Sequence, residues 1–204
     1  MVQEANWGNF KAKFNGKEQG VFQWFSYLLF CEEHKQPLGI SQYENHAGIE
    51  TDPIRVGQAV IGWQAKFYDT KLSDHKSEFI TAIDTATTRH PELTQIVFYT
   101  NRNFGQHKKK RDPQYKVDIE EHAKEKNISI VWKGKWFFET PFVAKENFII
   151  AKHFFSLEKS IFDLVGELKE HSQSILSPIR TEIVFTGNEI KIDRTAIIEA
   201  LKKV

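Results

Sequence analysis

The chain has 204 residues, 40% of them hydrophobic and 27% charged, a composition typical of a globular protein with a sizeable core. Its net charge of +1 excludes a global electrostatic attraction to nucleic acid, so a site for polyanions must come from local charge patterning. The single cysteine, Cys31, excludes an internal disulfide and a cysteine-rich zinc site. The sequence shows no signal peptide and no apolar stretch of transmembrane length, which predicts a cytoplasmic protein with no membrane partner.

The first third of the chain contains one helical pattern followed by strand patterns. The apolar run at residues 20–31 predicts a buried helix. Strands are predicted at residues 39–45, 48–54 and 59–69, with Pro53 at a strand end or edge. In a strand, alternate side chains point to opposite faces. In the strand at 48–54, Ile49 and Thr51 are therefore predicted to lie opposite Glu50 and Asp52. In the strand at 59–69, Trp63, Ala65 and Phe67 are predicted to lie opposite Gln64, Lys66 and Tyr68.

The remainder of the first 150 residues alternates regularly between helix and strand. Helices are predicted at residues 73–90 and 113–126, and strands at 94–101 and 128–132. This alternation predicts an α/β fold with a mixed sheet and helices on both faces. Beyond about residue 150 we expect a small appendage made of a helix, a hairpin and a helix, at residues 155–170, 182–192 and 193–201.

Four polar side chains stand out in the two central strands. If these strands are neighbours, Glu50, Asp52, Gln64 and Lys66 converge on one face at the end of a sheet. Carboxylate and amide oxygens are hard ligands that suit Mg²⁺ or Mn²⁺. A lysine beside such a metal can orient an attacking water and offset negative charge, which suits phosphodiester hydrolysis. The alternative from the residues alone is a solvated cluster of charges on an edge strand.

The segment "GIETDPI…IGWQAKFY" resembles the core of the PD-(D/E)XK nuclease superfamily, and within it the Mrr-like branch. Gly48-Ile49-Glu50 matches the first motif and Gln64-Ala65-Lys66 the second, within a resemblance that covers about residues 14–142. The chain looks most similar to N-terminal nuclease effector domains of antiviral STAND (Avs) NTPases and to CBASS-type DNA endonuclease effectors. The resemblance implies a restriction-endonuclease-like core in residues 1–150. It also implies a helical linker and hairpin in residues 151–204, leading toward an NTPase module.

The resemblance assigns roles to individual residues. It implies Glu50, Gln64 and Lys66 as catalytic residues, and Glu50, Asp52 and Gln64 as metal ligands. Glu50 replaces the usual aspartate, and Asp52 could share its role. Gln64 replaces the usual glutamate, and a neutral amide should hold a cation more weakly than a carboxylate. Helices that precede such a core often carry a glutamate that helps the metal or the water, and Gln23 or Glu18 could take that place here.

Basic residues outside the motifs suggest contacts with DNA. The loop "HKKKR" could grip phosphates, and Lys71, Arg102 and His75 could extend the patch, although a solvated loop is the simpler interpretation of any one residue. The predicted DNA-binding residues are Lys71, Arg102, Lys108, Lys109, Lys110 and Arg111. Tyr68 could contact substrate or simply cover the sheet.

Together these features predict an endonuclease dependent on Mg²⁺ or Mn²⁺ that cuts double-stranded DNA with little sequence specificity. We expect it to be the effector of an antiphage defence protein and to form a homo-oligomer within a larger STAND-type protein. Gln64 leaves an alternative open, a catalytically silent module for nucleic-acid binding or oligomerisation that keeps the nuclease fold.

Overall fold

The structure is a computed structural model that describes residues 1–41, 48–105, 112–158 and 161–176. The chain divides into two units, Met1–Glu158 and Lys159–Val204. In the second unit the structure describes one helix, α6 (Ile161–Leu176). The predicted hairpin at 182–192 and the last short helix lie outside the described residues. No helix in the described part of the chain has the length and apolarity needed to cross a membrane.

The first unit is built on a four-stranded mixed sheet, as its helix–strand alternation predicts. The strands are β1 (Ile54–Val56), β2 (Ala59–Lys66), β3 (Gln95–Thr100) and β4 (Ser129–Lys133), and they lie in the order β1-β2-β3-β4. β1 is antiparallel to β2, whereas β2, β3 and β4 are parallel. Because parallel strands share an edge for their carboxyl ends, Lys66, Thr100 and Lys133 all end at the same side of the sheet.

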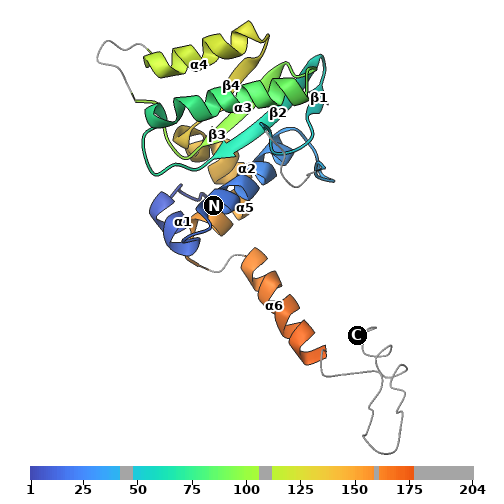
Figure 1. Ribbon diagram of the computed structural model, residues 1–204. Helices are drawn as coiled ribbons and strands as arrows, with labels where there is room; N and C mark the ends of the chain where they lie inside the picture. The colour runs from blue at the N-terminus through green and yellow to red at the C-terminus, as the bar shows by residue number, and fades with distance from the viewer. Residues whose placement is uncertain (42–47, 106–111, 159–160, 177–204) are drawn as a thin grey trace, which may run out of the picture. The chain divides into compact units, whose positions relative to one another are not determined.

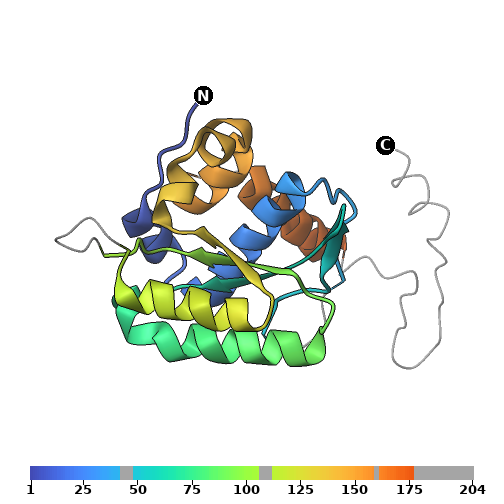
Figure 2. The ribbon, with the colours of Figure 1, turned by 90° about the horizontal axis from the view of Figure 1, so that it is seen from above.

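Two helices cover one face of this sheet. They are α3 (Lys76–Arg89), which continues from the 3₁₀ turn η1 (Leu72–His75), and α4 (Gln114–Glu125). They lie side by side in Figure 2. Their apolar stripes, with Phe79 and Ile83 of α3 and Ile119 of α4, pack with Ile96 and Phe98 of β3 in one buried cluster. Burial of this continuous apolar surface holds the two helices on the sheet.

The opposite face carries the larger, aromatic core. It is covered by α1 (Trp7–Lys13), α2 (Glu18–Glu33) and α5 (Phe148–Phe155), with the short helices η2 (Lys135–Glu139) and η3 (Phe142–Glu146) (Figure 1). The rings of Phe25 and Phe154 stack with their centroids 4.3 Å apart. Three residues of α5 are fully buried: Ala151, Phe154 and Phe155. The compact unit therefore continues past the predicted boundary at residue 150 to Glu158.

The elements differ from the predicted ones at three places. Residues 48–51 form a bend instead of a strand, residues 52–53 are irregular, and β1 begins only at Ile54, after Pro53. Of the strand predicted at 39–45, residues 39–41 are not in a strand and the others lie outside the described residues. The predicted helix at 155–170 is divided, because α5 ends at Phe155, Ser156 is extended, and α6 begins at Ile161.

Candidate functional site

The bend at residues 48–50 brings Glu50 against the end of β2. Gly48 has φ +90° and passes so close to α3 that a Cβ atom there would lie 2.4 Å from the backbone nitrogen of Ala86. Only glycine tolerates both the conformation and the contact. The backbone N–H of Glu50 then donates to the carbonyl of Trp63 at 2.9 Å, which anchors the bend to the sheet.

The carboxylate of Glu50 is held between the sheet and α2. Its Oε1 accepts the backbone N–H of Ala65 at 3.3 Å, and its Oε2 accepts Nε2 of Gln23 at 2.6 Å. Burial raises the pKa of Glu50, while the Ala65 N–H and the charge of Lys66 lower it. The ammonium of Lys66 is thus near enough to favour the ionised carboxylate. Glu50 and Lys66 are therefore coupled electrostatically near the end of β2.

Gln64, on β2, has a side-chain oxygen without a hydrogen-bond partner among the described residues. Its neighbours Trp63 and Ala65 pack into the aromatic core, so strand alternation turns Gln64 and Lys66 toward the α3 face. Gln64 is 7% exposed, and its Oε1 is buried with no hydrogen-bond partner in the part of the chain that the structure describes. A buried acceptor without a partner costs about 1–3 kcal/mol, and such a cost points to a ligand.

Glu50 and Gln64 fit a hard divalent cation. A carboxylate oxygen and an amide oxygen are both suitable ligands for Mg²⁺ or Mn²⁺. A cation would offset the cost of ionising the half-buried Glu50 and would give the Gln64 oxygen a partner. Within residues 1–41, 48–105, 112–158 and 161–176, no group of three or more His, Cys, Asp and Glu side chains could hold a metal.

Asp52 lies further along the bend, where the predicted alternation is wrong. Ile49 belongs to the cluster on the α3 face. The hydroxyl of the buried Thr51 instead accepts the indole N–H of Trp63, a residue of the opposite cluster, at 2.9 Å. A bend does not follow period-two geometry, so Ile49 and Thr51 separate. The backbone of Asp52 donates to the Ser41 carbonyl at 3.2 Å, and its role as a ligand stays a prediction.

Two glutamines of α2 support the site. Gln23, one of the two residues considered for the preceding helix, donates to Glu50. Gln19, one turn earlier, was missed. Its Nε2 donates to the Ala65 carbonyl at 3.0 Å and its Oε1 accepts the Phe67 N–H at 2.8 Å. Two glutamines four residues apart in an apolar helix are the sequence signal that could have revealed this pair, because i and i+4 share a face.

Tyr68 and His75 form a separate polar network beside Lys66. The Tyr68 hydroxyl donates to Glu78 at 3.1 Å, and its ring stacks on His75 with centroids 3.7 Å apart. His75 in turn lies 2.7 Å from both Glu78 and the Thr70 hydroxyl. Tyr68 is therefore buried and fully engaged, which favours its covering role. His75 is likewise bound to Glu78, whose charge opposes any patch that His75 was expected to extend.

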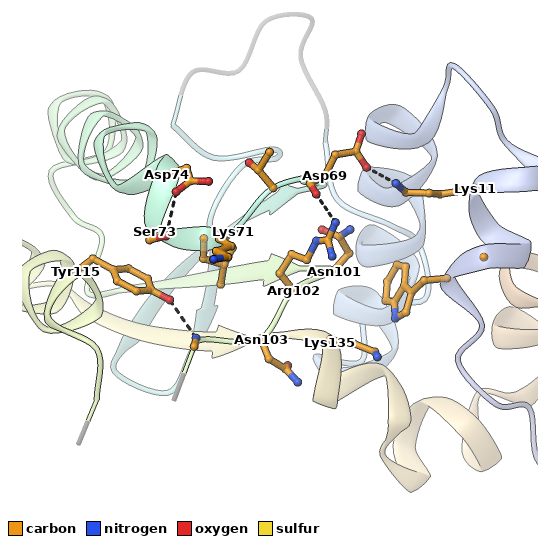
Figure 3. Close-up of a pocket in the computed structure, with 15 residues that line it drawn as sticks. Lys11, Asp69, Lys71, Ser73, Asp74, Asn101, Arg102, Asn103, Tyr115 and Lys135 are labelled. Carbon is orange, nitrogen blue, oxygen red and sulfur yellow. Dashed lines mark hydrogen bonds and ion pairs between the residues drawn. The ribbon is translucent and has the colours of Figure 1, made fainter. Parts of the chain in front are cut away.

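The predicted DNA-binding residues have different outcomes. Lys71 and Arg102 line the same cavity, of about 970 Å³, beyond the carboxyl ends of the strands (Figure 3). Arg102 donates to the carbonyls of Tyr68, at 2.9 Å, and Asp69, so its guanidinium braces the chain after β2. Lys108, Lys109, Lys110 and Arg111 lie outside the described residues. Glu50, Gln64 and Lys66 do not line this cavity, which neighbours their site.

No protein-family model matches this chain, and no curated protein matches its sequence.

Proposed function

We propose that the chain is a nuclease domain of PD-(D/E)XK type, with a restriction-endonuclease-like fold, which uses Mg²⁺ or Mn²⁺ to hydrolyse phosphodiester bonds of double-stranded DNA with little sequence preference. The observation that carries this proposal is the hydrogen bond from the Ala65 N–H to the Glu50 carboxylate, which places that carboxylate beside β2 between Gln64 and Lys66 in the sequence. The buried oxygen of Gln64 has no partner among the described residues, and the charge of Lys66 opposes the rise in the pKa of Glu50. Two oxygen atoms that can bind a metal, with a positively charged lysine nearby, are the groups that metal-assisted hydrolysis uses.

Each residue has a role in this reaction. Glu50 and Gln64 would hold the metal, which when bound polarises the phosphate and lowers the pKa of a water ligand. Lys66 positions the attacking water and offsets the negative charge that grows in the transition state. Gln23 keeps the carboxylate of Glu50 turned toward β2, and Gln19 fixes the backbone on both sides of Lys66. Such positioning lowers the barrier because the groups need no reorganisation during the reaction.

The wider biological role is part of the same proposal. We propose a cytoplasmic effector of an antiphage defence system, which acts as a homo-oligomer within a larger STAND-type protein. The compact unit ends at Glu158, and α6 lies in the second unit. This division is compatible with a nuclease core followed by a connector to another module.

One observation favours a second candidate, a catalytically silent module for nucleic-acid binding or oligomerisation. The position expected to carry a second carboxylate holds the neutral Gln64, and the described residues offer no group of three or more metal-binding side chains. A site with a single carboxylate binds Mg²⁺ weakly, since Mg²⁺ gives up its hydration water reluctantly.

A plasmid-nicking assay with Mg²⁺ or Mn²⁺ separates the two candidates. The native chain should convert supercoiled plasmid to open circles, and Lys66→Ala should lose this activity by about 10²-fold or more. Lys124→Ala is the matched control, because Lys124 is an exposed lysine at the far end of α4. Cutting that survives Lys66→Ala would remove the mechanism. DNA binding without cutting, even with Mn²⁺, would favour the silent module.

A further inference from the structure

A cavity of about 970 Å³ lies at the carboxyl edge of the parallel strands, beside the Glu50 site. One wall comes from Trp7 and Lys11 of α1, and the other from the segment 69–74 together with Tyr115 of α4. Residues 101–103, after β3, and Lys135, after β4, lie between these walls (Figure 3). We call this cavity the edge groove. Clefts at the carboxyl ends of strands in open α/β sheets are frequent ligand sites.

The edge groove concentrates positive charge. Its lining includes four cationic side chains, Lys11, Lys71, Arg102 and Lys135, against two carboxylates, Asp69 and Asp74. The groove therefore carries an excess of two positive charges, whereas the whole chain carries only +1. A concave surface with one sign of charge focuses its field on ligands of the opposite sign. An anionic ligand is thus the class that the groove suits.

The four cations are not equally available. Lys11 forms an ion pair with Asp69, and Arg102 is bound to the carbonyls of Tyr68 and Asp69. The exposed ammonium of Lys71 has no hydrogen bond or ion pair to the described residues, and Lys135 has only a loose pair with Glu139 at 3.9 Å. Figure 3 shows Lys71 on the wall formed by residues 69–74 and Lys135 apart from it, between the two walls. These two lysines can bind an anion without breaking a strong internal contact.

The groove begins very close to the candidate active site. Asp69, in its wall, follows Lys66 by three residues, so their Cα atoms lie at most about 11 Å apart. Phosphates on one DNA strand are separated by about 3.4 Å along the helix axis. The near end of the groove is therefore within roughly three nucleotides of a phosphate held at Lys66.

We propose that the edge groove binds the phosphodiester backbone of the DNA strand that passes the Glu50 site, with Lys71 and Lys135 as the contacting cations and Arg102 as the brace of the wall. This inference rests on the proposed function. It adds Lys135 to the predicted contacts and gives Arg102 a positioning role. Backbone contacts of this kind fix the register of the strand without reading its sequence.

The test measures binding of a fluorescently labelled duplex by anisotropy, in EDTA so that no cutting occurs, across a series of salt concentrations. Lys71→Gln and Lys135→Gln should each reduce the slope of log K against log salt by about 0.9, and the double variant by about 1.8. Lys124→Gln, whose position lies about 14 Å along α4 from Tyr115, should keep the native slope. Circular dichroism checks that the variants fold.

The outcomes separate this inference from the proposed function. A double variant with the native slope, in a chain that cuts DNA, overturns the groove and leaves the nuclease standing. A native chain that never cuts, but whose binding depends on Lys71 and Lys135, refutes the nuclease and supports the groove. Inorganic phosphate and a mononucleotide are the competitors. If either competitor displaces the duplex at the same phosphate concentration, the groove binds a free anion and the proposal fails. The proposal also fails if the native chain does not bind the duplex.

Discussion

Stability linked to metal binding tests the Glu50 site without measuring catalysis. The perturbation is Glu50→Gln, which keeps the shape of the side chain. Two donors face the native carboxylate, the Ala65 N–H and the Gln23 amide. The new amide oxygen can accept from Ala65, and its NH₂ group can donate to Gln23 if that amide turns over. Both hydrogen bonds of the site therefore survive.

Without metal, the free energy of unfolding of Glu50→Gln should stay within about 1 kcal/mol of native, because no hydrogen bond is lost. The pH dependence should differ. Burial raises the pKa of Glu50 in the folded chain. A raised carboxyl pKa gives stability that is complete below the unfolded pKa and is lost as pH rises through the folded pKa. Glu50→Gln should lack this loss.

With metal, only the native chain should gain stability. A cation at 100 times its Kd adds about 2.7 kcal/mol, and each kcal/mol raises Tm by about 2–4 °C in a domain of this size. We expect Mn²⁺ to raise the native Tm by roughly 5–11 °C relative to EDTA. The rise should grow with pH, because the cation binds the ionised carboxylate.

Thermal melts followed by circular dichroism, in EDTA and in Mn²⁺ at several pH values, measure both effects. Glu125→Gln is the control, since Glu125 is an exposed glutamate on α4. It should show the same Mn²⁺ response as the native chain. An equal Mn²⁺ response in Glu50→Gln would mean that the cation binds elsewhere, and no response in the native chain would refute the metal site.

Further substitutions at four positions test the contacts that support the site and the sheet. Glu33→Gln removes the ion-pair partner of Lys133, whose side chain is only 6% exposed, and should lower the free energy of unfolding in urea by about 2 kcal/mol. The loss stays below that of a fully buried ion pair because Glu33 is 36% exposed. Lys133→Met should leave the free energy of unfolding nearly unchanged, because the apolar methionine can pack against the rings of Tyr99 and Phe137. Equal losses of stability from Glu33→Gln and Lys133→Met would contradict this account. Gln19→Leu removes the hydrogen bonds to Ala65 and Phe67 and should cost about 2 kcal/mol and reduce plasmid nicking; unchanged nicking would show that α2 does not position Lys66. Thr51→Val leaves the buried indole N–H of Trp63 without its acceptor and should cost about 1–3 kcal/mol, whereas Thr51→Ser should restore most of it in the same unfolding assay.

The sequence was sufficient for the elements whose patterns are local. An apolar run predicted α2, an apolar stripe predicted α3, and a helix-start signal at residues 112–113 predicted α4, while alternating or short apolar runs predicted β2, β3 and β4. The alternation of these elements predicted a mixed sheet with helices on both faces, which is confirmed. Strand alternation also placed Gln64 and Lys66 on one face, because each strand residue turns its side chain opposite to its neighbours.

Local patterns failed where the chain leaves regular geometry. The alternation expected for residues 48–54 assumed a strand, but Gly48 adopts a positive φ against α3 and the segment bends. The helix expected at 155–170 included Ser156, where the structure has a break between α5 and α6. The apolar pattern does not show that Phe154 and Phe155 pack into the aromatic core as the end of a separate helix. In both cases packing with a distant element determined the backbone.

The remaining features depend on residues that meet only in the folded chain. Gln23 reaches Glu50 across 27 positions, and Lys133 pairs with Glu33 across 100. The edge groove similarly joins α1 with segments after β2, β3 and β4. Periodicity carries information over a few turns of helix or a single strand, so it identifies which side chains share a face. The burial of one apolar cluster on each face of the sheet then determines which helix and strand faces pack together. That packing in turn determines which polar groups become partners.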